Sequence, residues 1–482
     1  MTDLLRQAYD PETFRQQGHQ LIDSLADYLV NMQNDPRTAV LPWQSPADRL
    51  ENWQADYQRS PNPEVNKFWE VVVQQSMHLH HPHYVGHQVA PPVPVAALSG
   101  LVSGLLNNGM AIYEMGPVSS ALERMVMQET ARLLGYGASA GGIMTSGGTL
   151  ANLTALLAAR QQQVAGDAWQ TGEHPPLALL VSEEAHYCID RAAKVMGWGE
   201  GGVVKVPADE RFKMRTDQLD ACYRQAQAAG RQVVAVVGSA CTTSTGSYDP
   251  LDAIADFCQQ HSLWFHVDGA HGAAAALSPA DCHLVHGLAR ADSVTVDFHK
   301  MLLTPAITTG LLFRDETKSY QTFAQQASYL LNDDEGEWFN SGKRTFECTK
   351  RMMSIQVYSI LRTYGPDIFS DNVAHLYQLA RTFASMIKQR AAFQLAVAPE
   401  ANIVCFRYLS KELSEAALNQ LNATIRQRML EDGRFYLVQT QLRDTHFLRT
   451  TLMNPFTTET ILGQLLDEIE RIGKEISVEK QQ

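Results

Sequence analysis

Between Gly141 and Phe313 the sequence alternates short apolar runs with segments of helical character. The apolar runs are rich in valine and leucine, as buried strands are. Such strands, alternating with helices, are typical of βαβ units and of a mostly parallel sheet, whose ligands bind beyond the carboxyl ends of the strands. The predicted strands are 177–181, 203–206, 233–237, 264–267, 293–296 and 310–313, and the predicted helices between them include 150–160, 187–196, 219–229 and 251–260.

Length and composition exclude several classes of protein. The 482 residues, 45% of them hydrophobic, suffice for two or three structural units with a large core. A formal net charge of -13 argues against nucleic acid or an anionic membrane surface as a partner. We also expect no membrane span, because no apolar run approaches the roughly 20 residues that one needs.

The first residues and the cysteines both indicate a cytoplasmic protein. The stretch Met1–Arg6 has no basic region followed by an apolar core, so we expect no signal peptide. The seven cysteines are scattered and form no CxxC pair. They are predicted to be free thiols in a reducing compartment.

The N-terminal part is predicted to be a helical arm. Asp10-Pro11-Glu12 is a strong helix start, and an apolar stripe at helical spacing follows from Phe14 to Leu29. Such a stripe, with no domain beside it in the sequence, is expected to pack on something distant such as a second subunit. The predicted division is an arm and linker over 1–75, a large domain over 76–365 and a small C-terminal domain over 366–482.

Histidines are concentrated between His78 and His87. Their spacing matches no zinc pattern, and no cysteine or acid joins them. We therefore expect no metal there, and predict instead a loop that lines a ligand pocket.

Lys300 is the first candidate for chemistry. It follows the predicted strand Ser293–Val296 within Asp297-Phe298-His299-Lys300, and an apolar run comes directly after it. A poorly hydrated lysine is expected to have a lowered pKa and to act as a nucleophile. The alternative is an ordinary surface lysine after a buried strand.

Three further features lie at predicted strand ends. Thr145-Ser146-Gly147-Gly148-Thr149 precedes a helix and resembles an anion cradle, although it has no lysine of the nucleoside triphosphate type and a plain helix cap is the alternative. Asp268 ends a strand, where it either caps a turn or holds a proton on a buried heterocycle. His186 follows the end of another strand, where a helix-start histidine is the alternative.

A phosphate cradle, an acid for a ring nitrogen, a histidine against a ring and a lysine for a Schiff base are together what pyridoxal 5'-phosphate needs. In this combination the sequence resembles the group II pyridoxal phosphate-dependent amino-acid decarboxylases, which have the aspartate aminotransferase fold. That family includes the glutamate, aromatic amino-acid, histidine, diaminobutyrate and cysteine sulfinate enzymes. The resemblance extends over nearly the whole chain and is strongest at His81–Tyr84, Thr145–Asn152, Ala185-His186, Thr242-Thr243, His266–Ala270 and His299-Lys300.

The resemblance implies a fold-type I enzyme with a mostly parallel, seven-stranded type of sheet in a large domain and a small C-terminal α+β domain. It also implies a homodimer whose active site lies at the subunit interface, closed by a loop from the partner. The loop expected here lies between about residues 314 and 350.

The resemblance also implies a role for each motif residue. Lys300 forms the Schiff base, Asp268 pairs with the pyridine N–H, and His186 and Ala270 pack on opposite sides of the ring. The phosphate is held by Gly147, Gly148 and Thr149 together with His299, and Thr243 hydrogen-bonds near the ring substituents.

Substrate residues follow from the same resemblance. Arg449 matches the position that binds the substrate α-carboxylate, which suits the forked guanidinium group; the alternative is a surface salt bridge. The residues expected to shape the side-chain pocket are Tyr84, His87, Gln88, Tyr113 and Phe339.

Three positions depart from the family pattern. Cys241 replaces a usual glycine and Lys350 a usual arginine. The family's mobile loop usually carries a tyrosine that protonates Cα, and no tyrosine lies between Leu330 and Lys350.

The predicted reaction is the α-decarboxylation of an L-amino acid to its amine. The polarity of the pocket residues favours a small polar or acidic substrate, with an aromatic amino acid or diaminobutyrate as alternatives. The missing tyrosine makes a decarboxylation-dependent oxidative deaminase, which forms an aldehyde, the main rival. A protein that binds the cofactor without catalysis is disfavoured by the presence of both Lys300 and Asp268.

Overall fold

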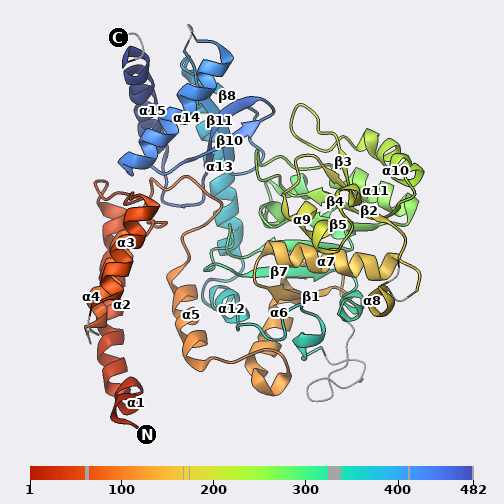
Figure 1. Ribbon diagram of the computed structural model, residues 1–482, viewed down its shortest axis with the longest axis horizontal. Helices are drawn as coiled ribbons and strands as arrows, with labels where there is room; N and C mark the ends of the chain where they lie inside the picture. Colours follow the sequence, from red (N-terminus) through yellow and green to blue (C-terminus); the bar gives the residue numbers. More distant parts are fainter. Residues whose placement is uncertain (60–63, 167, 173, 324–337, 411–412, 480–482) are drawn as a thin grey trace. The chain divides into compact units, whose positions relative to one another are not determined.

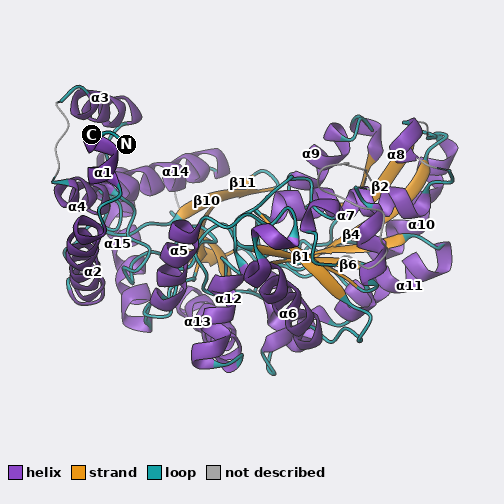
Figure 2. Cartoon of the chain, turned by 90° about the horizontal axis from the view of Figure 1, so that it is seen from below, coloured by secondary structure: helices purple, strands orange, loops and turns teal. Residues whose placement is uncertain are grey.

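The computed structural model describes residues 1–59, 64–166, 168–172, 174–323, 338–410 and 413–479. The contacts of the chain group it into two compact units. The first contains Met1–His87, Thr382–Ala396 and Cys405–Gln482, and the second contains Gln88–Arg381 and Val397–Val404. Both units combine helices with strands (Figure 2). The predicted domain limits at residues 75 and 365 stay a prediction.

A seven-stranded sheet forms the centre of the second unit (Figure 1). Strands β2 to β6 pair in parallel, and β7 runs antiparallel to both of its neighbours, β6 and β1. The predicted mostly parallel sheet is therefore confirmed. The strands, in spatial order, are β1 (Gly141–Thr145), β7 (Thr309–Phe313), β6 (Ser293–Asp297), β5 (Trp264–Asp268), β4 (Gln232–Ser239), β2 (Leu177–Ser182) and β3 (Val203–Val206).

Helices cover both faces of this sheet. On one face, α7 and α9 share a hydrophobic cluster with side chains of β1, β2, β4, β5 and β7. On the other face, Met127 of α6 packs against glycines of β1 and β7, and Ile254 of α11 packs against Gly238 of β4. The α-helices of this unit are α5 (Pro94–Leu106), α6 (Pro117–Leu133), α7 (Gly148–Gln163), α8 (Ala168–Thr171), α9 (Cys188–Val195), α10 (Leu219–Ala228), α11 (Leu251–His261) and α12 (Ser354–Tyr364). The long helix α13 (Asp367–Gln389) runs from this unit into the first.

The first unit contains a four-stranded sheet in the order β10-β11-β9-β8, in which β10 pairs antiparallel with β11 and β8 with β9. Helix α14 contacts both β11 and α15. The strands are β8 (Phe393–Leu395), β9 (Ile403–Tyr408), β10 (Val438–Leu442) and β11 (Thr445–Thr451), and the C-terminal helices are α14 (Glu415–Asp432) and α15 (Glu459–Glu479).

The N-terminal arm is helical, as predicted. The side chain of Asp10 accepts a hydrogen bond from the Thr13 N–H at 2.8 Å, and Pro11 is the first residue of α2. The arm consists of α1 (Asp3–Ala8), α2 (Pro11–Asn34), α3 (Pro46–Tyr57) and α4 (Val65–Gln75). Met32 is the one residue of these four helices that is buried among those described. Within the described residues, no helix is both long enough and apolar enough to cross a membrane.

The junction of β1 and β7 has no room for an additional methyl group at Gly142. A Cβ atom there would lie 2.2 Å from the Leu311 carbonyl oxygen and 2.8 Å from the Met127 methyl group. We expect Gly142→Ala to lower the free energy of unfolding by roughly 1–3 kcal/mol, the range for overpacked cores. Thermal unfolding measures this.

The matched control for this prediction is Gly137→Ala. Gly137 is exposed, and a Cβ atom there meets no other atom within 4 Å. It is expected to melt at or slightly above the wild-type temperature, because alanine restricts the unfolded chain more than glycine does. Equal melting temperatures for both variants would contradict the close packing at Gly142.

Candidate active site

A cavity of about 170 Å³ in the second unit is lined mainly by residues at or after the carboxyl ends of β1, β2, β4, β5 and β6. Parallel strands bring these ends to one edge of the sheet, which is where such sheets bind ligands. All the predicted cofactor residues except Gly147 line it, and Gly147 directly precedes one of them. The lining residues are Gln88, Gly148, Thr149, Asn152, His186, Cys188, Cys241, Thr243, Asp268, Ala270, His271, Asp297, His299 and Lys300.

The predicted anion cradle lies at the N-terminus of α7. Gly147 is the N-cap residue, with φ +112, and no side chain caps this helix end. That backbone conformation is strained for any residue with a Cβ atom, so glycine is needed for the turn. The positive end of the helix dipole and the first N–H groups of α7 are at this end of the helix, an arrangement that favours a bound anion.

Lys300 forms a buried ion pair with Asp297. The Lys300 Nζ atom lies 2.9 Å from Asp297 Oδ2, and Thr309 Oγ1 donates to Asp297 Oδ1 at 2.5 Å. His299 Nε2 lies 3.7 Å from the same carboxylate. This ion pair keeps a charged lysine inside the site before any ligand arrives.

The predicted fall of the Lys300 pKa is wrong for the chain by itself. Burial acts to lower this pKa, but the charge of Asp297, its hydrogen bond and then the charge of Asp268 raise it above the usual lysine value. Burial acts to raise the pKa of Asp297, yet Lys300 and His299 bring it below its usual range. The sequence reasoning missed Asp297 as the partner that reverses the effect of burial.

Asp268 lies at the end of β5 with both carboxylate oxygens in hydrogen bonds. Oδ1 accepts from the Ala270 N–H at 3.3 Å, and Oδ2 accepts from Asn152 Nδ2 at 3.0 Å. These two hydrogen bonds fix the orientation of the carboxylate, and Asp268 also lines the cavity.

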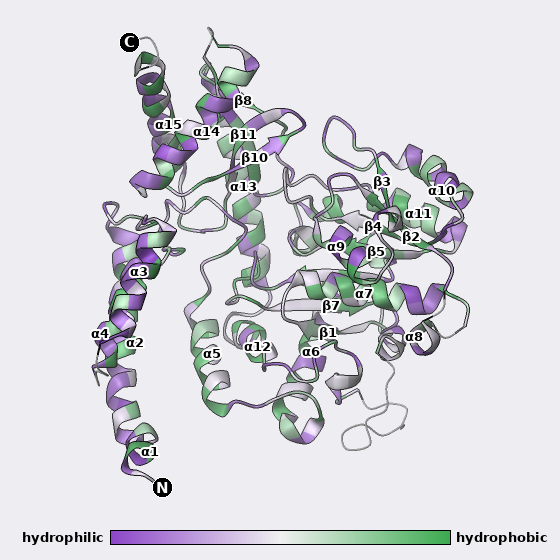
Figure 3. Ribbon diagram, in the orientation of Figure 1, coloured by the Kyte–Doolittle hydropathy of each residue, from purple (hydrophilic) through white to green (hydrophobic). Residues whose placement is uncertain are grey.

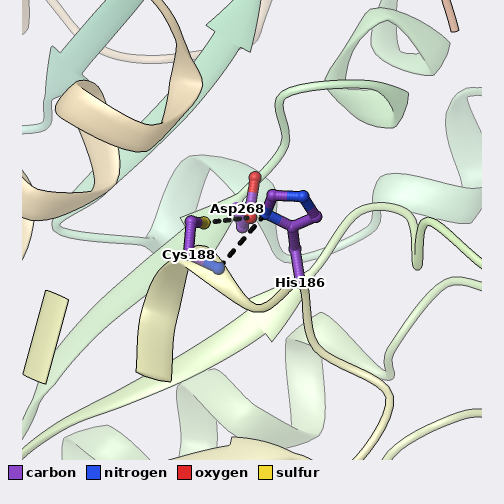
Figure 4. A group of neighbouring side chains, drawn as sticks. All are labelled: His186, Cys188 and Asp268. Atoms are coloured by element: carbon purple, nitrogen blue, oxygen red, sulfur yellow. Dashed lines mark hydrogen bonds between the residues drawn. The ribbon is translucent and has the colours of Figure 1, made fainter. Parts of the chain in front are cut away.

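His186 and Cys188 lie beside Asp268 (Figure 4). The Cys188 N–H donates to His186 Nδ1 at 3.4 Å, and Cys188 Sγ lies 4.0 Å from Asp268 Oδ2. Burial lowers the pKa of His186, which favours a neutral ring at neutral pH. Burial, followed by the charge of Asp268, raises the pKa of Cys188 to about 12, so this thiol is protonated.

The ligand atoms of His186, Cys188 and Asp268 lie within 4.8 Å of one another. These are residue types that bind transition metals. However, the Asn152 amide donates to both Cys188 Sγ and Asp268 Oδ2, at 3.2 and 3.0 Å, and a cation between them would have to displace it. We therefore assign no metal to this group.

Five lining residues were missed as candidates: Asn152, Cys188, Cys241, His271 and Asp297. For Asp297 the sequence does contain a signal. In β6 the polar residues Ser293, Thr295 and Asp297 occupy every second position, so they share one face of a strand whose other side chains are valines. Polar residues at that spacing in a buried strand indicate a face that turns toward a functional site.

Arg449, Tyr84 and His87 belong to the first unit. Arg449 is buried in β11, and Tyr84 is buried and stacked on Tyr436 with ring centroids 5.5 Å apart. The Tyr84 hydroxyl donates to the His87 carbonyl at 3.4 Å. Burial, followed by the charge of Arg449, lowers the pKa of His87, so these three predicted substrate residues form one group.

Tyr113 and Phe339 lie together in the second unit but do not line the Lys300 cavity. Their rings meet edge to face at 5.6 Å, and the Tyr113 N–H donates to Asn340 Oδ1 at 3.0 Å. Residues 324–337 of the predicted loop lie outside the described residues.

Lys350, one of the departures from the family pattern, is buried. Its Nζ atom donates to Glu123 and, at 2.7 Å, to the Met144 carbonyl. Burial lowers the pKa of Lys350, although Glu123 opposes this.

Comparison with known proteins gives concordant matches. A family model described as the pyridoxal-dependent decarboxylase conserved domain matches residues 48–409. A cysteine sulfinic acid decarboxylase of Homo sapiens is 30% identical over 468 residues, or 94% of each chain. An L-2,4-diaminobutyrate decarboxylase of Acinetobacter baumannii is 28% identical over 433 residues, or 86% of this chain and 85% of that one. The crystal structure of mouse CSAD in apo form superposes with a TM-score of 0.89 at 28% identity, covering 96% of this chain and 99% of that chain.

The cavity fits pyridoxal 5'-phosphate by the chemistry of its donors. The glycine turn before α7 offers backbone N–H groups and a helix dipole to a phosphate. Asp268, Ala270 and His186 offer a carboxylate and flat packing surfaces for a pyridine ring, and Lys300 offers an amine for its aldehyde.

Lys300 is predicted to be the attachment point of this cofactor. After incubation with pyridoxal phosphate and reduction by borohydride, peptide mass spectrometry should find the label on Lys300. Lys300→Ala should carry no label and should not turn over substrate, because no other lysine among the described residues lines the cavity. The control Lys194→Ala, on an exposed part of α9, should be labelled as the wild type is. A labelled Lys300→Ala protein would contradict the assignment.

Asp297 is predicted to set the pH range of attachment. In Asp297→Asn the burial of Lys300 remains while the neighbouring charge is lost, so the pKa of Lys300 should fall. The pH midpoint of borohydride-fixable attachment should then move down by about one unit or more. An unchanged midpoint would show that the ion pair does not control the amine.

Proposed function

We propose that this chain, which belongs to the pyridoxal-dependent decarboxylase family as its motifs predicted, removes CO₂ from a small polar or acidic L-amino acid and leaves the amine. The observation that carries the proposal is one cavity lined by a lysine, a carboxylate at a strand end and a glycine cradle. The family makes the chain a carbon–carbon lyase that uses pyridoxal phosphate.

Pyridoxal phosphate, when bound, supplies an electron sink for the pair released as the carboxylate leaves. Gly147, Gly148, Thr149 and His299 are proposed to hold its phosphate, and Thr243 to hydrogen-bond near the ring substituents. The ionised Asp268 is proposed to hold a proton on the ring nitrogen, which a preorganised carboxylate in a dry site does strongly.

Lys300 is proposed to bind the aldehyde through Nζ. Asp297, 2.9 Å from Nζ, holds this amine in the site, and Lys300 must lose a proton before it becomes a nucleophile. His186 and Ala270 are proposed to pack on the two faces of the ring and so to fix its plane.

Arg449 is proposed to bind the substrate α-carboxylate. It is buried beside Tyr84 and His87, which are proposed to contact the substrate side chain together with Gln88. Polar residues of this kind favour a polar or acidic side chain. Two relatives are named for polar substrates, one acidic and one basic: cysteine sulfinic acid decarboxylase and L-2,4-diaminobutyrate decarboxylase.

A homodimer is proposed from the surface of the second unit. Helix α5 is strongly hydrophobic (Figure 3), and its Leu98, Leu101, Val102 and Leu105 are 49, 49, 47 and 67% exposed. These positions follow helical spacing and form one apolar stripe, which is typical of an interface. Tyr113 and Phe339 are proposed to serve the partner's site across that interface. A cytoplasmic location stays a prediction.

Oxidative deamination is the second candidate. The sequence has no tyrosine between Leu330 and Lys350 to protonate Cα. Without a proton donor at that position, molecular oxygen and water would take part in the reaction instead, and the products beside CO₂ would be aldehyde, ammonia and peroxide.

A panel of amino acids decides both the substrate and the reaction. We expect CO₂ release to be fastest with cysteine sulfinate, aspartate, glutamate or diaminobutyrate, with one amine formed per CO₂. Oxygen uptake, aldehyde and peroxide in proportion to CO₂ would instead establish the oxidative reaction. Fastest turnover of an aromatic amino acid would reject the proposed substrate class.

Arg449→Ala is predicted to lower kcat/KM by about 30-fold or more, because losing the partner of a desolvated carboxylate costs roughly 2–5 kcal/mol. Arg449→Lys should recover only part of this loss, since an ammonium group cannot grip both oxygens. Steady-state kinetics on the best substrate measure both variants. Wild-type kinetics in the alanine variant would place carboxylate binding elsewhere.

A further inference from the structure

Asn152, on α7, makes every hydrogen bond that its side chain can make. Its Oδ1 accepts from Thr295 Oγ1 at 2.7 Å and lies 2.9 Å from His266 Nε2. Its Nδ2 donates to Asp268 Oδ2 at 3.0 Å and to Cys188 Sγ at 3.2 Å. The side chain is 1% exposed, so a change in any of these bonds would leave a buried polar group unsatisfied.

The hydrogen bonds continue away from Asp268 into the core. His266 Nδ1 lies 2.9 Å from Ser293 Oγ, which accepts from Trp264 Nε1 at 2.9 Å. We call the series Trp264, Ser293, His266, Asn152 and Asp268 the Asp268 hydrogen-bond chain. Its members from Trp264 to Asn152 are all buried.

The donor direction along this chain is determined at both ends. An ionised carboxylate only accepts, so the Asn152 nitrogen must face Asp268 and its oxygen must face His266. His266 therefore carries its hydrogen on Nε2, which leaves Nδ1 to accept from Ser293. The indole of Trp264 can only donate, which agrees with Ser293 accepting from it. Every bond points toward Asp268.

Strand geometry explains how these residues meet. Trp264, His266 and Asp268 alternate along β5, and Ser293 and Thr295 alternate along β6, so each set lies on one face. The register pairs His266 with Ser293 and Asp268 with Thr295. Because α7 packs on this face, Asn152 reaches both strands.

His266 is expected to be a neutral ring, which can polarise the neighbouring hydrogen bonds without carrying a charge itself. Burial lowers its pKa to about 4, although the charge of Asp268 and a hydrogen bond with the Ser293 backbone oppose this shift. A neutral ring has one N–H, and here that N–H points to Asn152. Aligned hydrogen bonds polarise one another in a low-dielectric interior, which strengthens the last bond, the one to Asp268.

We propose that Asn152 and His266 are positioning residues for Asp268, and that the Asp268 hydrogen-bond chain holds this carboxylate ionised and aimed at the ring nitrogen of the cofactor. The inference rests on the proposed contact between Asp268 and that nitrogen. In this proposal, buried residues of the sheet help to keep the nitrogen of the pyridine ring protonated.

The first experiment measures the ring nitrogen directly. Enzyme loaded with ¹⁵N-labelled pyridoxal phosphate is titrated by NMR between pH 6 and 10, and cofactor affinity is measured by fluorescence quenching. In Asn152→Leu we expect the ring nitrogen to lose its proton at a pH about one unit lower than in the wild type. We also expect the cofactor Kd to rise on the order of 10-fold, which is the size of effect seen when a residue that orients a binding residue is removed.

A matched pair at His266 separates positioning from packing. His266→Gln retains an N–H near Nε2 and should behave as the wild type, whereas His266→Leu should shift the nitrogen titration in the direction of Asn152→Leu. Unfolding of the cofactor-free variants reports packing alone. A folded Asn152→Leu protein with a wild-type nitrogen titration would overturn the proposal.

Asp268→Asn distinguishes the two levels of the argument. If it leaves the ring nitrogen protonated as in the wild type, the proposed role of Asp268 itself fails. If it removes the proton while Asn152→Leu does not, only the positioning role fails.

If Asn152→Leu does not fold, the proposal can still be tested on the wild-type protein. In the cofactor-free protein, ¹⁵N NMR of labelled histidine, assigned with His266→Gln, should show His266 protonated at Nε2 alone from pH 6 to 8. Protonation at Nδ1, or an imidazolium ion, would overturn the donor direction on which the proposal depends.

Discussion

Two carboxylates at the ends of neighbouring buried strands constrain the rest of the second unit. A charge that is withdrawn from water costs free energy unless it is paired or hydrogen-bonded. Asp297 is paired with Lys300 and hydrogen-bonded by Thr309. Asp268 accepts hydrogen bonds from Asn152 and from the Ala270 N–H. Each partner comes from a different element, so placing the two charges also fixes how β7, α7 and the loop after β6 approach the sheet.

Helix α7 connects the two ends of the proposed cofactor. Its N-terminus contains the predicted anion cradle at Gly147 and Gly148, and one turn later Asn152 hydrogen-bonds to Asp268. The alanines around Asn152 are fully buried, which lets the helix approach the strands closely enough for this contact. A shift of the helix would therefore change phosphate binding and carboxylate orientation together.

The ion pair between Lys300 and Asp297 shows why a single sequence feature misleads. Burial alone lowers a lysine pKa, and the apolar residues around Lys300 predicted that burial correctly. The neighbouring carboxylate reverses the direction, and it was visible three residues earlier in the chain. Whether residues three apart face each other depends on the local turn, which periodicity does not define.

The sequence by itself determined the mostly parallel sheet, the strand ends that carry functional residues and the family, because strand periodicity, glycine turns and short motifs are local properties. Only the tertiary structure decided which of those residues share a cavity and which partners they have. Asn152 and His266 lie 114 positions apart, and Asn152 and Thr295 lie 143 apart, so their contact depends on strand register and on the packing of α7. The same holds for Arg449, which is far in the chain from Tyr84 and His87 and is brought close to them by the fold. The motifs thus predicted what the site contains, and packing decided how its charges are held.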